Sequence, residues 1–253
     1  MPAAWIGALL VGLVLGLLGS GGSILTVPVL VYLVGEPSKL AIAESLGIVT
    51  IISGVGAIPF AMRQNVSWRS VLLFGLPGMA GAYLGALSSD YIPGALQLAI
   101  FATVMLMAAV LMFRKTSLHH RGDAPRAAWK IMIDGLLVGV LTGLVGVGGG
   151  FLIVPALVLL GGLPMHLAIG TSLSIIALKS IGGFYKYVDL LGADQMHWDL
   201  MLVFGALGIV GSFVGGRVGT YVPQDKLKRI FAGFLLVMGV VILWQNTALL
   251  LSG

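Results

Sequence analysis

Two glycine-rich breaks inside long apolar runs constrain the fold of this sequence more than any other feature. The segments read GLLGSGGSILTVP (16–28) and GLVGVGGGFLIVP (143–155), 127 residues apart. Because 58% of the residues are hydrophobic and only 9% are charged, the chain has too much apolar surface for a water-soluble core. The long unbroken runs predict an all-α polytopic membrane protein rather than a β-barrel, whose strands alternate.

The two halves of the chain repeat one another well beyond the breaks. Pro28 and Pro37 match Pro155 and Pro164, and AESL (43–46) matches GTSL (170–173). After a three-residue insertion Trp68 matches Trp198, and glycines match at 75/205, 78/208, 81/211 and 85/215. We therefore expect a first repeat (1–113), a polar cytoplasmic linker (114–130) and a second repeat (131–253). Internal repeats of this kind are common in secondary transporters.

The basic residues discriminate between two topologies for the broken runs. Each broken run either crosses the bilayer once, or enters, turns at the break and returns as a re-entrant hairpin. The re-entrant arrangement places eleven Lys and Arg residues outside the spans on one side and two, Lys39 and Lys186, on the other, as the positive-inside rule favours. Each repeat is then a re-entrant or broken helical hairpin plus three transmembrane helices. Three crossings are odd, so the repeats are inverted and both termini are predicted to be periplasmic.

The breaks are predicted to hold an anion near the middle of the membrane. Non-helical backbone at that depth is tolerated where it is buried in protein or lines a watery cavity, and free N–H groups at a helix start attract anions. The expected binding residues are Ser20, Gly21, Gly22 and Ser23 in one half and Gly148, Gly149 and Gly150 in the other. Close helix packing by small residues is the alternative, and it is the preferred interpretation of the glycines spaced along 75–85 and 205–215.

Ionisable residues inside apolar runs are the second signal. Lys179 lies inside the run 166–186 and shares one helical face with Ser172 and Lys186, seven residues to either side, so Lys179 and Ser172 are candidate anion-binding residues; a lysine paired with a carboxylate for assembly is the alternative. Glu44 lies near the outer end of its run, and three roles stay open: a proton-coupling carboxylate, a partner for Lys179, or an interfacial residue.

Other chemistries find little support in the sequence. There is no cysteine, which excludes disulfides and thiolate metal sites, and the four histidines lie in or beside loops, where we expect them to be solvated rather than metal-bound. No cofactor or metal is expected. No nucleic-acid partner is expected either, because the net charge of +5 comes from Lys and Arg residues in the loops between apolar runs, where topology explains them. No histidine within a span could serve a serine nucleophile, so an enzyme is not expected. The N-terminus lacks a basic n-region and is expected to be mature structure rather than a signal peptide.

The repeated motifs GLLGSGGSILTVPVL and GLVGVGGGFLIVPAL, each followed by a Pro-containing loop and AESLGIV or GTSLSII, resemble the TauE/SafE (sulfite exporter) family of membrane permeases. The resemblance covers almost the whole chain. It implies movement of sulfite, sulfoacetate or other organosulfonates, usually outward across a bacterial inner membrane. Related thiosulfate importers use cysteines in the pore, which this chain lacks.

These observations predict a multi-pass secondary exporter of small sulfur-containing anions in the bacterial inner membrane, working by alternating access around a midplane site. A passive anion channel on the same scaffold is the alternative. The expected partners are the anionic substrate and the lipid bilayer, with a homo-oligomer left open.

Overall fold

The computed structural model describes residues 2–20, 22–89, 94–113, 127–145 and 150–252, and every element in these ranges is a helix. The order is α1 (Pro2–Leu18), α2 (Gly22–Pro28), η1 (Val29–Val34), α3 (Ser38–Met62), α4 (Trp68–Ser89), α5 (Gly94–Phe113), α6 (Ala128–Val145), α7 (Gly150–Pro155), η2 (Ala156–Leu160), α8 (Met165–Leu191), η3 (Ala193–Gln195), α9 (Trp198–Tyr221) and α10 (Gln224–Ser252).

Four helices in the described part of the chain are long and apolar enough to cross a membrane: Leu40–Met62, Met165–Asp189, Trp198–Tyr221 and Gln224–Trp244. The all-helical, multi-pass membrane class expected from composition is therefore confirmed. The six full spans and two re-entrant hairpins expected from the charge pattern remain a prediction.

The two halves follow the same order of elements at their starts. A short α-helix ends at a proline in each, Pro28 in α2 and Pro155 in α7, and continues as the π-helical turns η1 and η2. Proline has no N–H to donate to the preceding turn, so the ordinary helical ladder is interrupted there, and a local π-type register is one way to accommodate the interruption.

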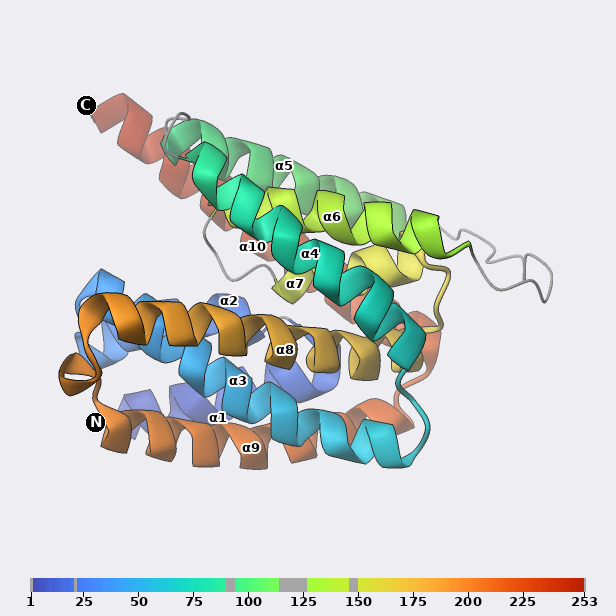
Figure 1. Cartoon of the computed structure of the whole chain (residues 1–253), viewed down its shortest axis with the longest axis horizontal. Coiled ribbons are helices and arrows are strands. Elements are labelled where there is room, and N and C mark those ends of the chain that lie inside the picture. The colour runs from blue at the N-terminus through green and yellow to red at the C-terminus, as the bar shows by residue number, and fades with distance from the viewer. Residues whose placement is uncertain (1, 21, 90–93, 114–126, 146–149, 253) are drawn as a thin grey trace. The chain divides into compact units, whose positions relative to one another are not determined.

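One compact unit, unit 1, comprises Met1–Val71 and His166–Val222. It joins α1, α2, η1 and α3 of the first half with α8 and α9 of the second, and Figure 1 shows α3, α8 and α9 running alongside one another. Helix α9 buries a stripe of small residues, among them Gly208, Gly211 and Gly215, while Leu202 and Val210 are more than half exposed. Small residues inside and large apolar residues outside suit a helix that packs closely on one face and meets lipid on the other.

The stripe of α9 lies directly against α1. A Cβ added to Gly211 or Gly215 would run into the backbone of Leu13 and its neighbours, and one added to Gly12 into Gly208. The predicted packing role of these glycines is thus confirmed.

The other compact unit, unit 2, comprises Leu72–Met165 and Pro223–Gly253. In it α4 approaches α6 through Gly78 and Gly139, and α5 approaches α10 at Leu106 and Gly239.

Corresponding residues of the two halves make the same kind of hydrogen bond at two places in unit 1. The backbone N–H of Ser67 donates to Thr171 Oγ1 at 2.9 Å, and the backbone N–H of His197 donates to Glu44 Oε1 at 3.0 Å. Ser67 and His197 each precede a helix, α4 and α9, and accept the first bond of that helix. A side chain near the start of α8 or α3 therefore fixes the start of α4 or α9 in the same manner.

Candidate functional site

The first glycine-rich break is a reversal of the chain inside unit 1. Helix α1 ends where the Gly19 N–H donates to the Leu15 carbonyl at 2.7 Å, and Gly19 has φ +78°, the left-handed conformation in which glycine ends helices. After the break the chain runs back along α1, because a Cβ on Gly22 would lie 2.8 Å from that of Leu15 and one on Gly7 2.8 Å from Val29 Cγ1.

Helix α8 holds this reversal in place. The Ser172 hydroxyl lies 2.9 Å from the Gly19 carbonyl and 2.8 Å from that of Ile169. A Cβ on Gly19 would lie 2.7 Å from Ser172 Oγ, so the glycine also permits the close approach of α8. Ser172 is buried, and its hydroxyl proton is engaged by the turn.

The serines of the break differ in their surroundings. Ser23 donates its hydroxyl to the Ser20 carbonyl at 2.8 Å. Ser20 is fully buried, and its hydroxyl has no hydrogen-bond partner among the described residues. Unpaired buried hydroxyls are rare and costly, which makes Ser20 available to a solute. Of the other predicted residues, Gly22 and Gly150 are buried at the starts of α2 and α7, while Gly21, Gly148 and Gly149 lie outside the described residues.

Lys179 lies two helical turns beyond Ser172 on α8 and is partly buried. No hydrogen bond or ion pair joins it to the rest of the described chain. Its predicted role in binding an anion remains a prediction.

Glu44 is fully buried near the start of α3 and accepts the His197 N–H. Its Oε1 also lies 3.1 Å from His197 Nδ1, which is likewise 3.1 Å from Glu36 Oε1. Among the described residues its ion-pair partner is therefore His197 and not Lys179, and its complete burial argues against an interfacial role. More than half of the His197 side chain is exposed, as expected for a solvated histidine, and its imidazole also contacts the two glutamates.

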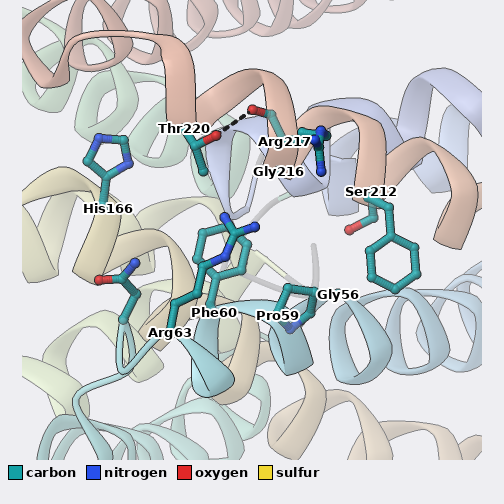
Figure 2. Close-up of a pocket in the computed structure, with 11 residues that line it drawn as sticks. Gly56, Pro59, Phe60, Arg63, His166, Ser212, Gly216, Arg217 and Thr220 are labelled. Carbon is teal, nitrogen blue, oxygen red and sulfur yellow. Dashed lines mark hydrogen bonds between the residues drawn. The ribbon is translucent and has the colours of Figure 1, made fainter.

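A cavity of about 220 Å³ opens in unit 1 at the far end of α3 from Glu44. Figure 2 shows Arg63 rising from the end of α3 toward α9, with His166 to one side and the Ser212 hydroxyl on the other. Arg217 and Thr220 of α9 complete the polar lining together with Asn65, and none of the described residues that line the cavity carries a carboxylate. We call this cavity the basic pocket.

Local structure explains why Arg63 faces this pocket. Helix α3 ends at Met62, and Gln64, at φ +57°, turns the chain so that the Asn65 N–H donates to the Phe60 carbonyl at 2.8 Å. Gly170 of α8 packs on this turn, since a Cβ there would lie 2.7 Å from Phe60 Cβ. The turn is therefore clamped between α3 and α8.

Ser212 gives the basic pocket an unsatisfied donor. Its side chain is 3% exposed, and its hydroxyl has no partner in the described part of the chain. Two guanidinium groups, an imidazole and an orphaned hydroxyl around one cavity form an environment that attracts a small oxyanion.

Sequence patterns identify Arg63 and Arg217 only as topology charges and predict no binding role for Ser212 or His166. A usable signal was present in the repeat. At the offsets of the repeat, Arg217 corresponds to Leu87, and Arg63 corresponds to the uncharged stretch 190–193. Both arginines therefore depart from the duplicated pattern.

Comparisons with known proteins agree with this membrane architecture. The family described as "Sulfite exporter TauE/SafE" matches residues 4–242. A "Probable membrane transporter protein" of Xylella fastidiosa strain Temecula1 is 34% identical over 252 residues, covering 96% of this chain and 95% of the relative. A relative from Methanocaldococcus jannaschii, also named as a probable membrane transporter protein, is 25% identical over 251 residues, with 93% and 94% covered. No solved structure matches.

Proposed function

The chain belongs to the TauE/SafE sulfite exporter family, and from this premise we propose that it exports a small sulfur-containing anion, such as sulfite or an organosulfonate. Its assignment as a multi-pass membrane transporter rests on the family and on its helices. The choice of a sulfur anion and the direction of transport are the proposal.

The basic pocket is the observation that carries the proposal. Arg63 and Arg217 contribute two guanidinium groups to a cavity with no acid among its described lining residues. Guanidinium groups bind oxyanions through paired N–H donors in a geometry that an ammonium lacks. Sulfite and sulfonates present three oxygens, and the volume of about 220 Å³ leaves room for such a head group with part of its hydration shell.

Groups further along unit 1 suit a path for the same anion. Lys179 is a cation within a span, where ionisable residues mark substrate pathways. The Ser20 hydroxyl, which has no partner in the part of the chain that the structure describes, lies at the chain reversal that Ser172 braces. In this proposal Ser20, Gly22, Ser23 and Lys179 of unit 1 bind the anion, and Ser172 positions the turn.

The basic pocket also supports the proposed topology. Arg63 and Arg217 line one cavity, so they belong on one side of the membrane, as the re-entrant arrangement requires; the single-crossing arrangement separates them. In this proposal both termini lie in the periplasm of a bacterial inner membrane, and the pocket lies on the cytoplasmic side. An outward-bound anion would be loaded there.

No nucleotide-binding motif is present, so the anion gradient and the membrane potential would supply the energy. Each negative charge leaving a cell interior at −100 mV releases about 2.3 kcal/mol. Alternating access of the anion site is the proposed mechanism, and proton coupling is the alternative source of energy. A passive anion channel is the second candidate, since Lys179, which has no partner among the described residues, and the basic pocket would also serve a pore.

Flux measurements on reconstituted protein test the proposal. Proteoliposomes loaded with labelled sulfite or sulfoacetate should release it at a rate that saturates with concentration. Arg63→Gln combined with Arg217→Gln should raise the half-saturating concentration, whereas the matched control Arg229→Gln, an exposed residue of α10 outside the pocket, should not. Protein-independent release of every sulfur oxyanion would refute the function. Non-saturating flux with single-channel currents would identify a channel instead.

A further inference from the structure

Three chemically reactive side chains meet at the end of unit 1 remote from the basic pocket. Glu36 precedes α3, Glu44 lies in its second turn, and His197 precedes α9. One ligand-type atom of each residue lies within 4.8 Å of the other two, and His197 Nδ1 is 3.1 Å from Oε1 of each glutamate. We call these residues the Glu–Glu–His cluster.

Among the described residues, His197 is the one basic partner of the two carboxylates of the Glu–Glu–His cluster. A single imidazole can supply at most one positive charge to two carboxylates, and like charges this close oppose ionisation unless a cation joins them. Glu44 Oε2 is moreover buried with no hydrogen-bond partner in the described part of the chain. A buried carboxylate oxygen without a donor is an unfilled ligand position.

The other half of the chain shows that fold stability does not demand these groups. Thr171 occupies the position of Glu44 and accepts the Ser67 N–H just as Glu44 accepts that of His197. The position that corresponds to Glu36 is Leu163. A neutral threonine–serine pair thus makes the structural contact, and the two carboxylates and the imidazole are additional to it.

We propose that Glu36, Glu44 and His197 bind one divalent transition-metal ion of the Zn²⁺ class. Nitrogen and carboxylate ligands of tetrahedral Zn²⁺ stand about 2.0–2.1 Å from the metal, so neighbouring ligand atoms lie about 3.3 Å apart, close to the 3.1 Å between Nδ1 and each carboxylate oxygen. Imidazole with carboxylates favours Zn²⁺, Mn²⁺ or Co²⁺ over the all-oxygen sites of Ca²⁺ and Mg²⁺.

Exposure differs between the three ligands in a way that suits ion entry. The His197 side chain is 56% exposed, that of Glu36 12% and that of Glu44 not at all. An ion can therefore reach the imidazole from solvent and bind against the buried carboxylate. Three protein ligands leave a fourth position for water. The bound ion would tie the start of α9 to the start of α3.

The site is distinct from the proposed anion path. Glu44 and Arg63 are 19 residues apart, which is about 28 Å along a helix. Under the proposed topology the Glu–Glu–His cluster faces the periplasm with Lys39. Metal binding can therefore be measured whether or not the protein carries a sulfur anion.

Direct metal titration tests the proposal. Tag-free protein carrying His119→Gln and His120→Gln, which removes the adjacent pair in the linker, is purified in detergent, stripped with chelator and titrated with Co²⁺. One Co²⁺ per chain should bind with visible absorption typical of a nitrogen–oxygen site, and Zn²⁺ should displace it and raise the thermal midpoint. Glu36→Gln and Glu44→Gln should each weaken binding at least tenfold, while Asp194→Asn, in the same α8–α9 connection, should not.

A variant designed on the other half separates metal loss from misfolding. Glu44→Thr with His197→Ser rebuilds the Thr171–Ser67 contact, so it should fold and elute like the parent but neither bind Co²⁺ nor gain stability from Zn²⁺. The proposal is overturned if the parent binds no Co²⁺ or Zn²⁺, or if the folded double variant binds them as tightly as the parent.

Discussion

The contact between Gly16 of α1 and Ser212 of α9 gives the sharpest structural prediction. A Cβ at position 16 would lie 2.7 Å from both the carbonyl carbon and the Cα of Ser212, and nearer still to its carbonyl oxygen. Ordinary contact begins at 3.4 Å, so Gly16→Ala requires α1 and α9 to separate by at least 0.7 Å. The obstacle is backbone, and no side-chain rotation can relieve it.

The cost of this separation can be bounded. Overpacking a well-packed interior typically costs about 1–3 kcal/mol, and alanine returns up to about 1 kcal/mol of helix propensity. We expect a net loss of about 1–2 kcal/mol. Because Ser212 lines the basic pocket, the same shift should also raise the half-saturating concentration for transported anion.

Thermal unfolding in detergent and flux in proteoliposomes measure the two effects. Gly219→Ala is the matched control, because a Cβ there would meet Leu17 Cδ1 at an ordinary 3.6 Å, and it should be as stable as the parent or slightly more so. If Gly16→Ala unfolds at the same temperature as Gly219→Ala, the close α1–α9 contact is refuted.

Three further predictions address the path and the topology. Ser172→Ala removes the hydrogen bond that ties α8 to Gly19 and should lower stability by about 1 kcal/mol, seen as an earlier thermal transition; an unchanged transition would contradict the bracing role. Lys179→Gln should slow anion flux at least fivefold while Lys179→Arg largely preserves it, measured in proteoliposomes at equal protein content, and undiminished flux in the glutamine variant would remove Lys179 from the path. A reporter enzyme fused after Gly253 should be active only in a periplasmic form, and cytoplasmic activity alone would overturn the proposed topology.

Patterns along the chain were sufficient to predict the break at Gly19 and the glycine stripe of α9. The left-handed conformation at Gly19 and the contact of α9 with α1 both follow from local rules, because glycine permits conformations and approaches that other residues forbid. The helical class likewise follows from composition. Such features are encoded over a few turns of chain and need no knowledge of which helices become neighbours.

The basic pocket and the Glu–Glu–His cluster depend on contacts between distant segments. Arg63 and Arg217 are separated by 154 residues in sequence and meet only because α3 packs on α9. Glu44 and His197 meet for the same reason. In sequence each of these residues resembles an ordinary loop or interfacial group. Its neighbours, and so its possible binding role, become known only when α3, α8 and α9 are packed together.

The compact units do not follow the predicted repeats. Unit 1 takes α8 and α9 from the second half, and unit 2 takes α4 and α5 from the first. Helices of the two halves pack on one another through equivalent contacts. Helix α3 accepts a hydrogen bond from the residue before α9, and α8 accepts one from the residue before α4. The repeats therefore describe which segments are alike in sequence, whereas the compact units describe which helices pack together.

The ionisable residues of unit 1 that differ between the two halves lie near the two ends of α3. Glu44 and His197 stand where the other half has Thr171 and Ser67, and Arg217 stands where it has a leucine. The same backbone contact to a side-chain oxygen is made in both halves, by Thr171 and by Glu44, so the carboxylate and the imidazole are additional to it. The Glu–Glu–His cluster lies near the start of α3 and the basic pocket near its end. The acidic cluster suits a cation, and the basic pocket suits an anion.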